Sequence, residues 1–179
     1  MRPGPISLFA SLSLLLLAAC AEQTSGPLQP RLAYEPGTGT VFNERDFEWS
    51  RRPGSGAIDG VVEFNARGEA YSCSGEDVIL TPETPWVMRR MYILYGSVNS
   101  AAVPVDIVRA RTPSAGASGD YASYARKTSC DASNRFSFSG LAAGGWYVLT
   151  LARPVDGGPK VAVMRRVQVG AGMRSVTLD

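Results

Sequence analysis

The sequence predicts an all-β fold, a Greek-key β-sandwich of about seven strands over residues 57–179. Nineteen glycines and twelve prolines separate many short runs that are rich in valine, threonine and aromatic residues, a composition typical of strands joined by tight turns. Apolar and polar residues alternate in several of these runs, as in a strand with one buried face. No segment keeps a convincing helical period for three turns, so we expect no long helix.

The first predicted strands follow directly from this alternation. Residues 57–64 alternate in polarity, and residues 65–68 (Asn-Ala-Arg-Gly) then indicate a turn. A second strand is predicted at 77–81, and it should end at Pro82 because proline cannot donate a ladder hydrogen bond.

The middle of the domain is less clear. Residues 86–95 are apolar and aromatic but contain two arginines, so a short helical turn and an edge strand both remain open. The alternation of Val103, Val105 and Ile107 predicts a further strand, which Pro104 restricts to a sheet edge. Residues 110–125 are rich in serine, glycine and alanine and are expected to form a long loop, where binding residues often lie.

The strongest β signal lies in the last third of the chain, after a predicted turn at 131–134. Strands are expected at 135–139, 146–151, 161–169 and 176–178. Trp146 and Tyr147 are adjacent in one of these strands and should point to opposite faces of the sheet. We therefore expect one of them to be buried and the other to be at least partly exposed.

The N-terminus has the layout of a secretory signal. Arg2 precedes an apolar run from Ile6 to Leu17, which is too short to cross a bilayer as a permanent helix. The run ends in Leu-Ala-Ala-Cys at Cys20, which resembles a bacterial lipobox. This resemblance implies a signal peptide at 1–19, acyl chains (palmitate) on Cys20 and, because Ala21 rather than aspartate follows, an outer-membrane lipoprotein. A soluble secretion signal cut after Ala21 and an uncleaved anchor are the alternatives.

Residues 20–56 are expected to be the lipidated cysteine and an extended tether, because this segment is rich in proline and glycine. Its stretch 41–49 is too aromatic for a simple spacer, since Phe42, Phe47 and Trp49 lie within it. Two interpretations remain open. Either these side chains pack on the sandwich, or they dock on another envelope component.

Cys73 and Cys130 remain once Cys20 is assigned to the lipid. In an oxidising exported compartment, an even pair of cysteines is more often bridged than free. We therefore expect a Cys73–Cys130 disulfide, the alternative being two buried thiols that never meet.

Several motifs together resemble the carboxypeptidase regulatory-like domain. They are Gly60-Val61-Val62, Cys73 to Pro82, Thr84-Pro85-Trp86, Cys130 to Phe138, and the corner Gly140-Leu141-Ala142-Ala143-Gly144 followed by Trp146-Tyr147. The resemblance covers about 57–179. It implies a prealbumin-like (transthyretin-like) sandwich, and it implies no peptidase activity because that activity belongs to a separate domain.

The sequence offers little for catalysis. It contains no histidine, which removes the usual general base near neutral pH and the commonest metal ligand. No nucleophile elbow, Walker loop or dinucleotide-binding fingerprint occurs. We therefore expect no enzyme activity, no cofactor and no metal. The net charge of +2 gives no reason to expect nucleic acid.

These observations predict a non-catalytic interaction or structural module, lipid-anchored at the outer membrane of a Gram-negative bacterium and facing the periplasm. Its membrane contact would be the lipid on Cys20, and its partner an envelope protein. The alternative is a carbohydrate-binding module that recognises an envelope glycan through exposed aromatic side chains. The candidate contact residues for either function are Trp86, Tyr92, Tyr95, Tyr121 and Tyr124.

Overall fold

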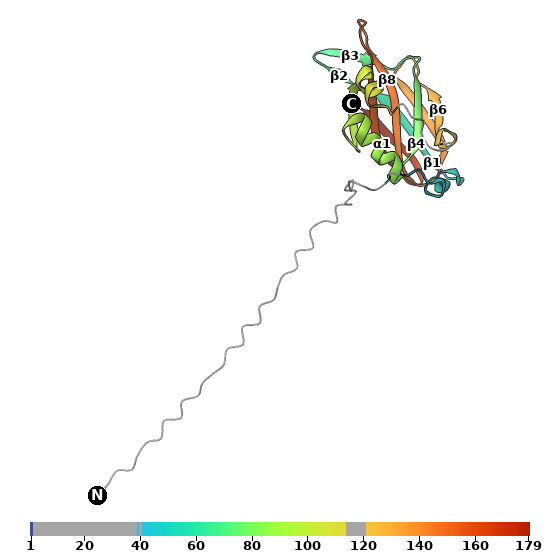
Figure 1. The fold of residues 1–179 in the computed structure, drawn as a ribbon, viewed down its shortest axis with the longest axis vertical. Helices are drawn as coiled ribbons and strands as arrows, with labels where there is room; N and C mark the ends of the chain where they lie inside the picture. The colour runs from blue at the N-terminus through green and yellow to red at the C-terminus, as the bar shows by residue number, and fades with distance from the viewer. Residues whose placement is uncertain (2–38, 40, 114–120) are drawn as a thin grey trace. The chain divides into compact units, whose positions relative to one another are not determined.

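The computed structural model describes residues 41–113 and 121–179, together with Met1 and Gly39. The predicted signal peptide, Cys20 and part of the 110–125 loop therefore lie outside the described residues. The described part is mostly β, with two sheets and two α-helices (Figure 1). A β-sandwich is thus the observed fold class, although the described residues form ten strands rather than about seven.

The smaller sheet has three strands in the order β10-β1-β7. Strand β1 (Gly56–Val62) is central, and it pairs in parallel with β10 (Gly172–Leu178) and antiparallel with β7 (Arg135–Leu141). Side chains alternate along β1, so that Ile58 and Val62 are buried against the larger sheet.

The larger sheet is built around the eleven-residue strand β8 (Gly144–Pro154). One edge of β8 pairs with β9, and β9 pairs in turn with β5. The other edge of β8 pairs with β4 and with β3. On their outer sides, β4 pairs with β6 and β3 pairs with β2. The bounds of these strands are β2 (Asn65–Ala66), β3 (Glu69–Ser72), β4 (Asp77–Pro82), β5 (Ser100–Pro104), β6 (Arg126–Ser129) and β9 (Val161–Val169).

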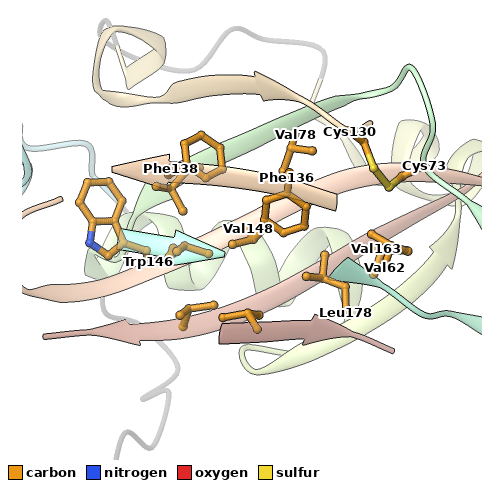
Figure 2. Packing of buried hydrophobic residues seen from close by; sticks show 14 of the residues in the cluster. Val62, Cys73, Val78, Cys130, Phe136, Phe138, Trp146, Val148, Val163 and Leu178 are labelled. Carbon is orange, nitrogen blue, oxygen red and sulfur yellow. A yellow bond between two sulfur atoms is a disulfide. The ribbon is translucent and has the colours of Figure 1, made fainter. Parts of the chain in front are cut away.

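A first hydrophobic core fills the space between the sheets. Figure 2 shows Phe136, Phe138 and Val148 within it, with Trp146 at one end. The indole of Trp146 is fully buried, and its Nε1–H donates to the carbonyl oxygen of Ala142 at 3.2 Å. A buried indole needs such a partner, because an unpaired N–H in an apolar core is costly.

The expected disulfide is present. Cys73 and Cys130 are bonded, with their Cα atoms 5.7 Å apart, and both lie in the first core (Figure 2). The bridge joins residues 57 positions apart in the chain, and closing a loop of this length stabilises a fold by roughly 4 kcal/mol in the chain-entropy model.

The helices cover the other face of the larger sheet, as seen for α1 (Pro85–Tyr95) in Figure 1. Helix α1 begins where the Thr84 hydroxyl accepts from the N–H of Val87 at 3.1 Å, and Pro85 occupies the first helical position. It ends at Gly96, which has a φ of 73°. Below it lies a second hydrophobic core that includes Tyr147.

Helix α2 (Val105–Arg111) follows β5 directly. The expectation that strand character would continue through Val105 and Ile107 is wrong, because the strand ends at Pro104. Val105 and Val108 pack against the second core instead, and their spacing of three residues suits a helix face. Of the two alternatives for residues 86–95, the helical one is correct, and α1, with eleven residues, is longer than the short turn expected.

The expectation that one of Trp146 and Tyr147 would be exposed is wrong as well. They face opposite sides of the sheet as predicted, but both are fully buried because the helical layer covers the Tyr147 side. The Tyr147 hydroxyl donates to the Val98 carbonyl at 2.9 Å. Burial, together with the nearby Glu83 carboxylate, raises the pKa of Tyr147, so the phenol stays a donor.

Residues 41–51 belong to this folded unit. Two short 3₁₀ helices, η1 (Glu44–Asp46) and η2 (Glu48–Arg51), place Phe47 in the second core with no exposed surface. Trp49 packs edge-on against Trp146, with ring centroids 5.1 Å apart. The first interpretation of this aromatic segment, packing on the sandwich, is therefore confirmed.

The close approach of β1 to β7 predicts an effect of Gly60→Ala. A Cβ atom at Gly60 would overlap the ring of Phe136 in the first core, so we expect a loss of about 1–3 kcal/mol in the free energy of unfolding. Urea denaturation would measure it. Gly170→Ala is the matched control, because its Cβ would meet nothing within 4 Å, and a change within about 0.5 kcal/mol is expected. Equal losses in the two variants would contradict this packing.

Candidate functional site

The five aromatic residues expected to bind a ligand all lie in the helical layer. Trp86, Tyr92 and Tyr95 belong to α1, whereas Tyr121 and Tyr124 belong to the short 3₁₀ helix η3 (Tyr121–Tyr124). Their exposure differs. Tyr95 and Tyr124 are buried, Trp86 and Tyr121 are partly buried, and Tyr92 is 49% exposed. The expectation of exposed rings thus fails for Tyr95 and Tyr124.

Trp86 and Tyr121 do not form a flat platform. Their ring centroids are 5.1 Å apart but the planes are inclined by 49°, and the Arg90 guanidinium lies 5.6 Å from each centroid. Phe42 meets Trp86 edge-on at 5.6 Å. The rings of Trp86 and Tyr121 are therefore in contact with neighbouring side chains and present no open stacking surface. Their contacts connect the N-terminal segment, α1 and η3.

An open pocket of about 270 Å³ lies beside Tyr95, on the face of the larger sheet that carries the helices. Its floor consists of Ile79 from β4 and of Leu149 and Leu151 from β8, which are all only half-buried. The phenol of Tyr95 forms one wall. The pocket therefore has a flat apolar floor with an aromatic side.

Two carboxylates form the rim of this pocket. Glu76 accepts from Lys160 Nζ at 2.6 Å and from Arg153 at 3.1 Å, and its side chain is only 12% exposed. Asp77 lies 2.7 Å from Lys127 Nζ, and its side chain is 55% exposed. The rim therefore presents ion-paired carboxylate oxygens as hydrogen-bond acceptors beside the apolar floor.

Such a pocket suits a sugar ring. A pyranose has an apolar face of C–H groups and an edge of hydroxyls. The floor can accept the C–H face, while the rim can exchange hydrogen bonds with the hydroxyls. A largely apolar cavity with a few fixed polar groups is the usual form of a small-molecule site, and hydrogen bonds to charged groups are the stronger ones.

The sequence reasoning missed most of this pocket. Glu76 and Asp77 belong to no recognisable local motif, yet Glu76 is largely buried between two cations. A signal was present in the alternation along β4. Val78 and Leu80 point into the first core, so Asp77 and Ile79 must share the opposite face.

No group of three or more acidic, cysteine or histidine side chains is placed to hold a metal ion within the described ranges. No helix in the same part of the chain is long and apolar enough to cross a membrane.

Comparison with known proteins supports the fold alone. No protein family and no curated protein matches the chain. A solved structure from Pseudomonas aeruginosa, described as a "putative carbohydrate binding protein", is similar with a TM-score of 0.53 and 19% identity, over 76% of this chain and 96% of that one. At this identity the likeness shows a shared β-rich fold. The likeness to the carboxypeptidase regulatory-like domain rests on the motifs alone.

The burial of Tyr95, the wall of the pocket, predicts that the stability of the protein depends on pH in the alkaline range. Burial raises the pKa of Tyr95 to about 12, with Tyr121 adding to the rise and Arg90 opposing it. Between pH 10 and 12 the unfolded chain therefore loses this proton while the folded protein keeps it, and stability falls as the pH rises. Tyr95→Phe should remove about 1 kcal/mol of the stability loss between pH 9 and 11. Urea unfolding at several pH values would test this; identical pH profiles would contradict it.

Proposed function

We propose that this protein is a non-catalytic glycan-binding module of a Gram-negative cell envelope, in which the pocket beside Tyr95 holds one sugar ring. The lipid on Cys20 would keep the module at the outer membrane, facing the periplasm. The observation that carries the proposal is the combination in one pocket of an apolar floor and ion-paired carboxylates.

Two further observations support a glycan over a protein partner as the ligand. The pocket is small, and its polar groups lie around an apolar centre, which suits a ring of mixed polarity better than a flat protein surface. The similar structure from Pseudomonas aeruginosa bears a description that names carbohydrate. The absence of histidine and of known catalytic motifs from the sequence supports a binding role.

Binding of envelope glycans tests the proposal. Peptidoglycan fragments and lipopolysaccharide core oligosaccharides would be titrated into the purified full-length protein by calorimetry. Asp77→Asn keeps the shape of the rim but removes one charge, so we expect affinity to fall about tenfold, the cost of one charge-assisted hydrogen bond. Because Asp77 is half-exposed, the variant should still fold.

Asp59→Asn is the matched control. Like Asp77, Asp59 is a half-exposed strand aspartate beside a basic residue, here Arg135 at 4.0 Å, but it lies on the smaller sheet. Its replacement should leave glycan affinity unchanged. An equal loss in both variants, or no binding of any glycan by the unchanged protein, would refute the proposal.

The proposed anchor makes a separate prediction. Cys20→Ser removes the thiol that would receive the lipid, so the variant should leave the membrane fraction and appear in the soluble envelope fraction. Three acyl chains bury many methylene groups at about 0.8 kcal/mol each, which makes their loss decisive for membrane attachment. Fractionation with immunodetection would measure it. Retention of the variant in the membrane fraction would contradict the anchor.

A further inference from the structure

Every second residue of strand β9 points into the first core, and one of these inward residues is charged rather than apolar. Val163, Val167 and Val169 point into the first core, and Arg165 occupies the inward position between them. Its register partner on β8 is Val148, a member of the same core, and paired residues on neighbouring strands project to the same face. The stem of Arg165 therefore starts from the inner face of the larger sheet, although its side chain keeps 37% exposure.

Strand β10 repeats this exception from the other sheet. Val176 and Leu178 point into the first core, and Arg174 occupies the preceding inward position. Its register partner is Ile58, which is 1% exposed. Arg174 itself is exposed at the edge of the sandwich. Two arginines thus project from the facing sides of the two sheets, where the sequence pattern would place apolar residues.

Both arginines line one cleft of about 150 Å³ between β9 and β10. Val167 and Val176 form its base, and Gln168 and Thr177 add polar groups. Arg166 also lines the cleft, but Glu83 accepts from its Nε at 2.7 Å. The charged residues that line the cleft are thus all arginines, and its lining contains no acidic residue.

Protection of a sheet edge explains only part of this arrangement. Inward charges on an edge strand prevent pairing with another chain, and β10 is an edge strand. Arg165, however, is paired on both sides, with Val148 on β8 and with Ser100 on β5. Edge protection therefore does not account for Arg165, and the pair of arginines needs a second reason.

The ion pairs suggest what that reason is. Asp179 forms an ion pair with Arg165 through a carboxylate that is 66% exposed. Among the described ion pairs, none involves Arg174. One guanidinium thus holds an exchangeable, solvent-exposed carboxylate, and the other is free to bind an incoming anion. Guanidinium groups bind carboxylate and phosphate oxygens in the same two-pronged geometry.

We propose that the cleft between β9 and β10 binds an oxyanion, a phosphate carried by a sugar or by a lipid headgroup, between Arg165 and Arg174. Asp179 acts as an internal competitor for Arg165 and leaves when the phosphate enters. This site is separate from the pocket beside Tyr95, so either one can fail without the other.

Titration with inorganic phosphate, followed by two-dimensional amide NMR of the full-length protein, tests the site. Amide signals of β9 and β10 should shift. Arg174→Gln should weaken the affinity for phosphate at least about tenfold, and Asp179→Asn should strengthen it several-fold because the competitor is removed. Arg109→Gln on α2, an exposed arginine outside the cleft, is the control and should change nothing.

Arg174→Gln should weaken phosphate binding and Asp179→Asn should strengthen it. These opposite, site-specific changes distinguish binding in the cleft from a general attraction of phosphate to a positively charged surface. Equal affinities in all four proteins, or shifts spread over the whole surface, would overturn the proposal. Arg174→Met keeps the apolar part of the side chain and replaces Arg174→Gln in this test if the glutamine variant fails to fold.

Two further probes identify the source of the phosphate. Stronger binding of glucose 6-phosphate than of inorganic phosphate indicates a sugar phosphate, and binding to phosphatidylglycerol vesicles but not to phosphatidylcholine vesicles indicates a headgroup.

Discussion

Burial of strand β8 on both of its faces is the constraint on which the rest of the structure depends. Trp146 and Tyr147 are adjacent, point in opposite directions and have no exposed surface. One belongs to the core between the sheets and the other to the core beneath the helices. A second sheet alone cannot meet this requirement, so the fold needs a further layer. That layer comes from α1, α2 and the 3₁₀ segments before the first strand.

The candidate site exists because the helical layer covers only part of the outer face of the larger sheet. The helices cover Tyr147 and Met164, but they leave Leu149 and Leu151 only half-buried on the same face. The remaining strip of the sheet is the floor of the pocket, and Tyr95 stands at its boundary. The site is thus a consequence of where α1 ends, and the charged rim limits how far the exposed apolar surface extends.

The strands could be predicted from sequence because one-sided burial leaves a period of two. Strands β7 and β9 were found in this way. The sequence leaves helix α1 undecided between a helical turn and an edge strand, because eight of its eleven residues are apolar or aromatic and hide a helical period. Its ends were more informative, since Thr84 followed by proline, and then Gly96, are typical start and stop signals. The continuous apolar run of β8 was itself a sign of burial on both faces.

The binding residues could be predicted only in part. Tyr95 was named, but as an exposed ring rather than as the wall of a pocket. Glu76 meets Arg153 and Lys160, which lie 77 and 84 positions away in the chain, and no local pattern reports such a meeting. Arg165, in contrast to Glu76, can be noticed from the local sequence pattern. It breaks a visible alternation of valines, so the sequence alone marks that position as unusual.

The disulfide has a consequence for proteolysis. The helices α1 and α2 both lie within the stretch of chain between Cys73 and Cys130. Cleavage by a trypsin-like protease at the exposed Arg109 or Arg111 would therefore leave two fragments that stay covalently joined. A nicked molecule would keep its original mass on a gel run without reductant and would separate into two bands only after reduction.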